Sequence, residues 1–303
     1  MQLGFVTAIL DTFSFEEVLQ FAAAEGFECV EAMCWPEGGP DRRYGGVRHI
    51  AVEDMSQAQA DDINARCAKH GVSISGLGYY SNPLADSAEE AVHSLAHLRK
   101  VIAAAPLLGL EIVNGFVGAN TKLSLDDNMQ RFADIWPDVV RYAEDRGVKI
   151  AIENCPMLFP NTWPFGMNLA RTPAIWRRMF EIIPSPNFGL NYDPSHLVMM
   201  LMDPIKPIRE FGDRIFHAHA KDMRADKDSL DDVGALAPPM QRCLAKIPGY
   251  GDVHWGLWVG ALTDVGFDGA VCIEIEDEAF TETLEGRKQS LRISRNVLRP
   301  LIA

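Results

Sequence analysis

The stretch IAIEN at residues 150–154 decides how this chain is interpreted, together with three similar stretches: FGLNYDPSH at 188–196, IFHAHAKDM at 215–223 and VCIEIED at 271–277. In each stretch, apolar residues occupy every second position and the polar residues fall at the positions between them. This pattern is typical of a β-strand with two different faces. A strand that is apolar towards helices and polar towards an enclosed interior favours a barrel. The polar phase is therefore predicted to point inside.

The rest of the chain repeats the same unit about every 40 residues: an amphipathic helix, a glycine and a hydrophobic strand. Glycine just past a helix tolerates the left-handed conformation that closes it. These junction glycines are Gly26, Gly71, Gly109, Gly147 and Gly266. Alternation of strands and helices implies parallel strands, and eight such units imply a single (β/α)8 TIM barrel.

We expect one domain that spans residues 1–303, because no linker-like or low-complexity tract divides the chain. The strands are predicted at 2–8, 27–34, 72–79, 110–117, 149–154, 188–194, 215–222 and 270–277. The helices are predicted at 15–25, 54–70, 89–108, 126–145, 173–182 and 255–265, with less regular ones at 201–211 and after 280. The long loops at 36–53, 155–172 and 224–254 all follow strands, which places function at the carboxyl ends of the strands.

Composition limits the function classes. The chain is 48% hydrophobic and has no apolar run of the roughly 20 residues that span a bilayer, so no membrane partner is expected. Its amino terminus enters a strand with no signal-peptide pattern, which predicts a cytoplasmic location. The formal net charge of −14 argues against a nucleic-acid partner. The six cysteines show no CxxC spacing and are expected to be reduced.

Four of the inward-facing residues have metal-ligand chemistry: Glu153, Asp193, His219 and Glu274. Taken singly, each has an ordinary interpretation, because Asp193 before Pro194 could cap a helix and a strand-end glutamate could form a salt bridge. Four strands that offer a ligand at the same end favour a metal site instead. Three carboxylates and one imidazole suit Mn²⁺ best, with Mg²⁺ or Co²⁺ as alternatives, and make Zn²⁺ less favoured.

Five short motifs resemble the xylose isomerase-like barrel superfamily: IEN at 152–154, DPSH at 193–196, HAHAKD at 217–222, GYGDV at 249–253 and GFDG followed by IE within 266–274. The closer likeness is to the sugar phosphate isomerase/epimerase branch, which includes ketose 3-epimerases and inosose dehydratases. The resemblance covers nearly the whole chain. Because one scaffold hosts many reactions, it is specific for the fold and the metal site and much less specific for the substrate.

The resemblance implies roles for named residues. Glu153, Asp193, His219 and Glu274 correspond to the metal ligands, and the two glutamates to the groups that move protons on opposite faces of a sugar. His196 matches a substrate-contacting histidine. Arg224 lies one residue from the position of a substrate-binding arginine, and His217 is expected to contact substrate or to support the ligands.

The neighbouring polar and aromatic residues receive more modest predictions. We expect Lys221 to belong to a polar network inside the barrel, and Asp277 and Glu278 to lie on an exposed rim. Aromatic residues near the strand ends, among them Trp35 and Tyr80, could stack on a sugar or another ring, but packing at the rim is the prediction we favour.

The function predicted first is a metal-dependent isomerase or epimerase that acts on a small sugar or keto-sugar through α-proton removal and a metal-stabilised enediolate. The alternative is a metal-dependent lyase or dehydratase that acts on a keto-sugar, an inosose or a 3-keto glycoside, because elimination shares the same first step. A DNA-repair endonuclease of the superfamily is disfavoured, since residues 72–80 and 110–118 contain no histidine. A non-enzymatic binding barrel would predict a broken ligand set, whereas all four candidate ligands are present here.

Relatives are often homodimers or homotetramers, and the resemblance therefore implies one of these assemblies. The sequence contains no glycine-rich phosphate loop, which favours an unphosphorylated sugar.

Overall fold

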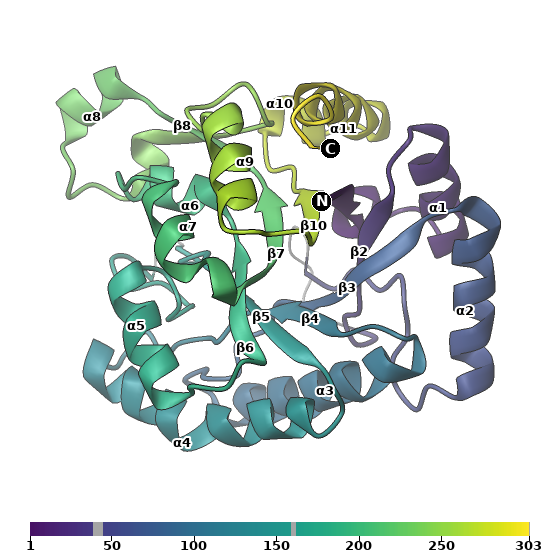
Figure 1. The fold of residues 1–303 in the computed structure, drawn as a ribbon. Coiled ribbons are helices and arrows are strands. Elements are labelled where there is room, and N and C mark those ends of the chain that lie inside the picture. The colour runs from purple at the N-terminus through teal and green to yellow at the C-terminus, as the bar shows by residue number, and fades with distance from the viewer. Residues whose placement is uncertain (39–44, 159–161, 303) are drawn as a thin grey trace.

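Eight parallel strands form a closed barrel in the computed structural model, which describes residues 1–38, 45–158 and 162–302. The strand order around the barrel is β1-β10-β7-β6-β5-β4-β3-β2, as the ribbon in Figure 1 shows. The strands span Gln2–Val6 (β1), Cys29–Met33 (β2), Ser73–Tyr79 (β3), Ile112–Gly115 (β4), Lys149–Glu153 (β5), Phe188–Tyr192 (β6), Ile215–Ala220 (β7) and Ala270–Ile273 (β10). All eight predicted strands are confirmed, and with them the (β/α)8 TIM barrel.

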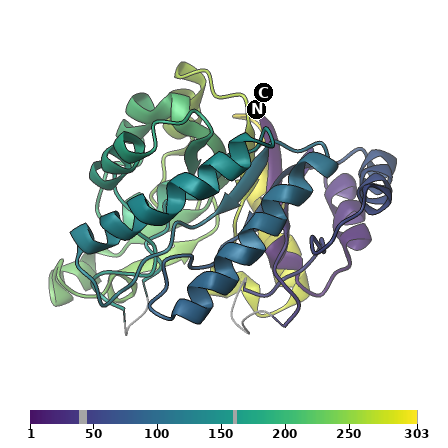
Figure 2. The ribbon, with the colours of Figure 1, turned by 90° about the horizontal axis from the view of Figure 1, so that it is seen from below.

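Helices surround the barrel on its outside, and α3 and α4 lie along the face that Figure 2 presents. The longer helices span Phe15–Ala24 (α1), Gln57–His70 (α2), Ala88–Leu107 (α3), Leu125–Glu144 (α4), Pro173–Ile182 (α5), Trp255–Asp264 (α9) and Leu284–Leu298 (α11). Shorter ones span Pro194–Met199 (α6), Lys206–Phe211 (α7), Lys227–Val233 (α8) and Glu278–Thr281 (α10), with single 3-10 turns at Thr7–Leu10 (η1), Gly212–Arg214 (η2) and Pro239–Gln241 (η3). Among the residues that the structure describes, no helix is both long and apolar enough to span a membrane.

Local sequence signals set the helix ends. A serine side chain accepts a hydrogen bond from the first turn of each of α1 to α4, which satisfies a backbone N–H that the helix itself leaves unpaired. The five junction glycines all have left-handed φ values, between 66° and 75°. A side chain is strained in that conformation, so glycine is favoured where each helix turns into the next strand.

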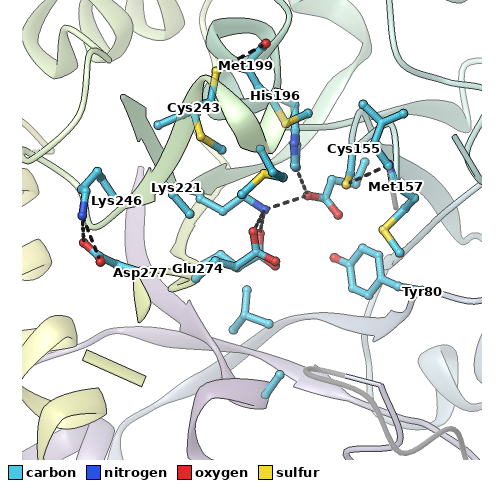
Figure 3. Close-up of a pocket in the computed structure, with 18 of the residues that line it drawn as sticks. Tyr80, Cys155, Met157, His196, Met199, Lys221, Cys243, Lys246, Glu274 and Asp277 are labelled. Carbon is cyan, nitrogen blue, oxygen red and sulfur yellow. Dashed lines mark hydrogen bonds and ion pairs between the residues drawn. The ribbon is translucent and has the colours of Figure 1, made fainter. Parts of the chain in front are cut away.

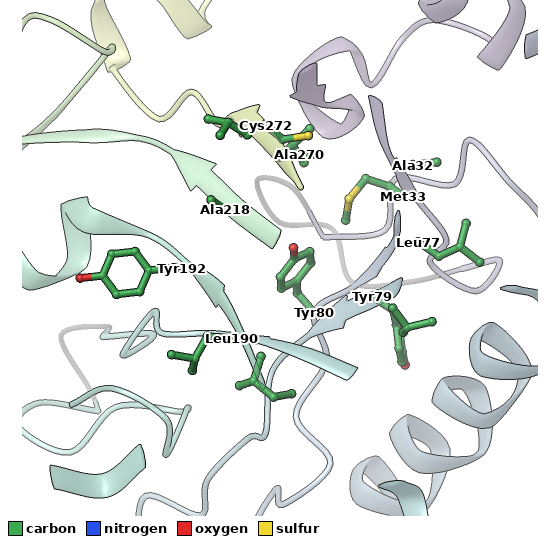
Figure 4. Packing of buried hydrophobic residues seen from close by; sticks show 14 of the residues in the cluster. Ala32, Met33, Leu77, Tyr79, Tyr80, Leu190, Tyr192, Ala218, Ala270 and Cys272 are labelled. Atoms are coloured by element: carbon green, nitrogen blue, oxygen red, sulfur yellow. The ribbon is translucent and has the colours of Figure 1, made fainter. Parts of the chain in front are cut away.

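The strand alternation divides the buried residues into two layers. On β6, Phe188 and Tyr192 face outward: Phe188 packs against the aromatic rings of α4, and Tyr192 against Trp176 of α5. Asn191, on the opposite phase, is fully buried inside the barrel. Figure 4 shows the apolar residues of this wall, including Leu190, Tyr192 and Ala218. The outer layer therefore stabilises the barrel, which leaves the inner phase free to carry polar groups.

The segment expected as a long loop after β7 contains regular structure, which corrects that expectation. Strands β8 (Asp222–Ala225) and β9 (Cys243–Lys246) pair antiparallel in a hairpin separate from the barrel, and α8 lies between them in sequence. Asp222 fixes its base by accepting hydrogen bonds from the backbone N–H groups of Gly249 and Val253 and from the indole of Trp255, at 2.9–3.0 Å. Strands this short give little periodic signal, so the pattern alone did not distinguish them from a loop.

Candidate metal centre and substrate cavity

Four side chains meet at the carboxyl ends of neighbouring barrel strands. Glu153 ends β5, Asp193 follows β6, His219 lies near the end of β7 and Glu274 follows β10. One donor atom from each lies within 4.8 Å of the donor atoms of the other three. The structure thus brings together the four residues that the sequence identified as candidate ligands.

His219 turns a different ring nitrogen towards each side of this cluster. Its Nδ1 lies 3.4 Å from an oxygen of Glu153 and 3.3 Å from an oxygen of Glu274. Its Nε2 lies 2.7 Å from the carboxylate of Glu31, on β2. The Asn191 amide nitrogen lies 2.9 Å from the same Nε2, but the carboxylate contact is shorter, and we therefore assign the proton to Nε2, because two lone pairs would repel each other. When the ring is neutral, Nδ1 then carries a lone pair that is directed towards Glu153 and Glu274. A metal ion held by those carboxylates could be coordinated by this lone pair.

Glu31 was missed at the sequence level, although a single charged residue in the apolar strand Cys29–Met33 is a signal that could have identified it. Its side chain is fully buried and also accepts a hydrogen bond from the hydroxyl of Tyr80, at 2.5 Å. Tyr80 was expected to pack at the rim; its hydroxyl instead joins a buried polar network. The amide of Asn191 donates to that hydroxyl at 3.0 Å, which ties β6 to the same group.

His217 lies in this deeper network and does not line the cavity described below. Its Nδ1 donates to the side-chain oxygen of Asn191 at 3.0 Å, and its Nε2 lies 3.0 Å from the hydroxyl of Ser75. Glu31, His217 and His219 also satisfy the spacing of a three-ligand metal group. Both nitrogens of His217 already have hydrogen-bond partners, so we interpret this group as a supporting network for His219.

Lys221 extends into the midst of the candidate ligands, in agreement with the prediction of a polar network inside the barrel. Its ammonium nitrogen lies 2.7 Å from Glu274, 3.3 Å from Asp193 and 3.8 Å from Glu153. A further carboxylate, that of Glu276, lies 3.5 Å away. Figure 3 shows the ammonium group between Glu274 and a second carboxylate. Several negative charges thus meet in a largely buried space, and such an arrangement favours bound cations.

The charges shift the pKa values of these groups in opposite directions. Burial alone would raise the pKa of Glu153, but the Lys221 ammonium and the rings of His196 and His219 hold it well below its usual range. Burial alone would lower the pKa of His219, but the Glu31 carboxylate and contacts with Glu153 and Glu274 hold it well above its usual range. The site therefore stabilises negative carboxylates together with positive charge among them, whether that charge is a proton or a metal ion.

The other predicted contacts fall in different places. His196, in α6, is buried with its Nε2 3.2 Å from Glu153, and it lines the cavity. Arg224, on β8, is exposed and is not among the cavity-lining residues, so the structure does not bring it to the candidate ligands.

The prediction of an exposed rim is wrong for Asp277. Its side chain is 2% exposed and pairs with Lys246 of the hairpin at 3.2 Å. Glu278 is exposed, as predicted.

A cavity of about 660 Å³ opens above the candidate ligands. Glu153, His196, Lys221, Glu274 and Glu276 form its charged side, and Lys246, Asp277 and Glu278 also line it. Most of the remaining lining residues are apolar and come from the strand ends, from the loop after β5 and from the hairpin. In Figure 3, Tyr80 and Met157 lie on one side of the cavity and the Lys246–Asp277 pair lies on the other. The volume lies within the range of roughly 300–1,000 Å³ that is common for small-molecule sites.

The donor atoms fit a divalent cation. Asp193 Oδ2 and His219 Nδ1 are buried without a well-aligned hydrogen-bond partner. Native proteins rarely leave such atoms unsatisfied, and a metal ion that accepts their lone pairs would remove the cost. Oxygen donors dominate the set, which suits a hard cation.

Comparisons with known proteins agree with this architecture. Residues 19–301 match the model of the family described as xylose isomerase-like TIM barrel. The uncharacterized protein YfiH of Bacillus subtilis is 27% identical over 310 residues, covering 91% of this chain and 93% of its own length. Inosose dehydratase of Lacticaseibacillus casei is 29% identical over 111 residues, or 36% of this chain and 37% of its own.

Solved structures share the fold at low sequence identity. D-psicose 3-epimerase of Clostridium cellulolyticum H10, solved with D-tagatose, superposes with a TM-score of 0.73 at 15% identity, covering 100% of this chain and 99% of its own. The IolI protein with a bound zinc atom superposes with a TM-score of 0.73 at 18% identity over 100% of both chains. At these identities the similarity establishes the fold alone.

Proposed function

Because the chain belongs to the xylose isomerase-like TIM barrel family, and two of its four clustered candidate ligands line one cavity, we propose that it is a divalent-metal-dependent isomerase or epimerase of a sugar or keto-sugar. The observation that carries this proposal is the position of Glu153 and Glu274, which both line the cavity and both belong to the ligand group. A carboxylate in that position can hold a cation and also reach a substrate proton.

In this proposal Glu153, Asp193, His219 and Glu274 hold one metal ion, with Mn²⁺ favoured by the oxygen-rich donor set and Mg²⁺ or Co²⁺ as alternatives. When bound, such an ion would draw electron density from the substrate's carbonyl and adjacent hydroxyl oxygens and so make the α-proton more acidic. Asp193 is fully buried and does not line the cavity, which suits a group that only holds the ion.

The residues of this chain would carry out the proton transfers. Glu153 stays deprotonated at neutral pH, because Lys221 and the nearby histidines lower its pKa, and it can accept the α-proton. Glu274, which follows a different strand of the barrel, is also a carboxylate, because Lys221 lowers its pKa against the effect of burial. It can pass a proton from the Lys221 ammonium, 2.7 Å away, to the opposite face of the substrate. Lys221 lines the cavity within 2.7 Å of Glu274 and can donate a hydrogen bond to a substrate oxygen. Removal on one face and return on the other inverts a single carbon.

Elimination is the second candidate function, and His196 is the observation that favours it. Its ring lies beside Glu153 and lines the cavity. Burial lowers the pKa of His196, but the neighbouring Cys155 and then Asp193 outweigh burial and hold that pKa well above its usual range. A protonated imidazole there can give its proton to a departing oxygen after Glu153 takes the α-proton. The C–O bond then breaks, the leaving group departs protonated, and an unsaturated ketone remains.

Proton NMR in deuterated solvent tests both candidates. Protein loaded with Mn²⁺ should exchange the α-proton of a ketose or 3-keto sugar, and the metal should be removed by chelation before spectra are recorded, since Mn²⁺ broadens them. New stereochemistry at the α-carbon identifies an epimerase, and an unsaturated product identifies a lyase. Glu153→Gln should lower the exchange rate about 10²- to 10⁴-fold, the usual contribution of a general base.

Glu111→Gln is the matched control, because Glu111 is exposed at the opposite end of the barrel, just before β4. It should exchange at the rate of the unaltered chain. If the loaded protein exchanges no α-proton on any of these sugars, or if Glu153→Gln keeps the full rate, the proposed role of Glu153 is wrong.

A further inference from the structure

The cavity above the candidate ligands has two sides of different chemistry. Its charged side is formed by Glu153, Glu274 and the charged residues beside them. Lys246, Asp277 and Glu278 add charge elsewhere, and most of its other lining residues are apolar. Five of the twelve methionines of the chain line it: Met33, Met157, Met199, Met223 and Met240. Methionine is flexible and polarizable, and it is used heavily on surfaces that accept varied apolar groups.

Much of the apolar side comes from the β8–β9 hairpin. Met223 lies on β8, Met240 in η3 between the two strands, and Cys243 and Leu244 on β9. This segment takes no part in closing the barrel, and Asp222 anchors its base. Figure 1 shows the neighbouring α8 projecting away from the barrel. The hairpin therefore adds a wall to the cavity beyond the eight barrel strands.

Two large apolar side chains of this wall are open to solvent. Met240 is 58% exposed and Leu244 is 41% exposed, and both line the cavity. Exposed apolar groups inside a concave site gain from contact with an apolar ligand group. A sugar ring carries hydroxyls around its edge, and those hydroxyls would lose water against such a wall without gaining hydrogen bonds. A bare sugar suits the charged side of the cavity only.

We propose that the substrate is a sugar derivative with an apolar substituent, such as an aromatic group joined through a glycosidic oxygen, and that the hairpin wall binds this substituent. The inference rests on the proposed function, because it assigns the sugar to the charged side of the same cavity. The volume of about 660 Å³ accommodates both parts in one connected space.

Binding of two unreactive probes tests the inference without any turnover. Phenyl β-glucoside and methyl β-glucoside share the sugar and differ in the apolar group, and neither carries the ketone that the reaction needs. Isothermal titration should show about tenfold or greater preference for the phenyl glucoside. NMR of protein labelled at the methionine methyl carbons should show shifts at Met223 and Met240 with the phenyl probe and much smaller ones with the methyl probe.

Variants of the wall make the test specific. Leu244→Asp should reduce the preference for the phenyl probe about tenfold and leave binding of the methyl probe unchanged, and Met240→Ala should give a smaller loss in the same direction. Leu236→Asp is the matched control, because Leu236 lies in the segment that joins β8 to β9, is 91% exposed and is not among the cavity-lining residues. This variant should bind both probes as the unaltered chain does.

An affinity for the phenyl glucoside no greater than that for the methyl glucoside, including no binding of either, overturns the inference. So does a preference that Leu244→Asp and Met240→Ala both leave intact. Failure of the proposed function has a different signature, since the phenyl preference would then persist while no sugar exchanges its α-proton.

Discussion

Two layers of polar residues lie inside the same end of the barrel and differ in how well they are satisfied. The layer nearer the cavity, called the cavity layer, consists of the cavity-lining Glu153, Glu274 and Lys221 together with Asp193 beside them. It contains a buried oxygen, Asp193 Oδ2, with no well-aligned hydrogen-bond partner. The inner layer consists of Glu31, Ser75, Asn191 and His217, and no side-chain atom of these four is left buried without a partner. His219 lies between the layers and offers one ring nitrogen to each.

This difference separates a support from a binding site. Buried polar groups that satisfy one another form a rigid network, whereas unsatisfied ones are costly unless a ligand completes them. The inner layer sets the orientation and the tautomer of His219, and the cavity layer retains unused donor capacity. Three substitutions test the distinction, and their expected effects decrease from the cavity layer to the inner layer.

The largest effect is expected from Asp193→Asn in the cavity layer. The amide keeps the side-chain oxygen that accepts from the backbone of Ser195 at 2.8 Å but removes the charge that would hold the metal. Titration with Mn²⁺ should show that the affinity falls by more than about 100-fold. Removal of a group that only hydrogen-bonds to a metal ligand usually lowers metal affinity by about 10- to 100-fold, so the loss of a ligand should cost more. The control Asp268→Asn alters an exposed aspartate at the opposite end of the barrel. Unchanged Mn²⁺ binding in Asp193→Asn would remove this residue from the ligand set.

An intermediate effect is expected from Glu31→Gln in the inner layer. The neutral amide still contacts His219 and Tyr80 but no longer fixes the proton on His219 Nε2 by charge. Mn²⁺ affinity should fall about 10- to 100-fold, while the circular dichroism spectrum stays that of the folded protein. If Mn²⁺ binds Glu31→Gln as tightly as the unaltered chain, the inner layer does not support the metal centre and the comparison between the layers loses its functional meaning.

The smallest effect is expected from Ser75→Ala, also in the inner layer. It removes the hydroxyl 3.0 Å from His217 Nε2 and touches neither His219 nor the candidate ligands. The free energy of unfolding should drop by about 1 kcal/mol, the usual net worth of one hydrogen bond. Denaturant titration measures that change, and Mn²⁺ affinity should stay within about twofold. A tenfold loss of Mn²⁺ affinity would show that the two layers act as one unit.

The periodic part of the molecule could be predicted element by element, with strand bounds that differ from the structure by up to four residues, the largest difference being at the end of β10. The strand alternation and the repeat of helix, glycine and hydrophobic strand together identified all eight barrel strands, because both signals depend on neighbours in sequence. The hairpin at Asp222–Ala225 and Cys243–Lys246 was not predicted, since its short strands are held by Asp222 through contacts with residues up to 33 positions away. Asp277 was misplaced for a similar reason, because its partner Lys246 lies on that hairpin.

The candidate site shows the same division. Glu153, Asp193, His219 and Glu274 could be proposed from sequence, because each occupies the inward phase at the end of a recognisable strand and parallel strands bring those ends together. Glu31 and Tyr80 could not be proposed from sequence, because their role depends on how they are placed around the imidazole ring of His219. The sequence by itself therefore determined the barrel and the residues that reach its interior. The tertiary structure decided which nitrogen of His219 faces the other candidate ligands and which side chains form the apolar wall of the cavity, because both depend on contacts across the barrel that leave no periodic trace in the chain.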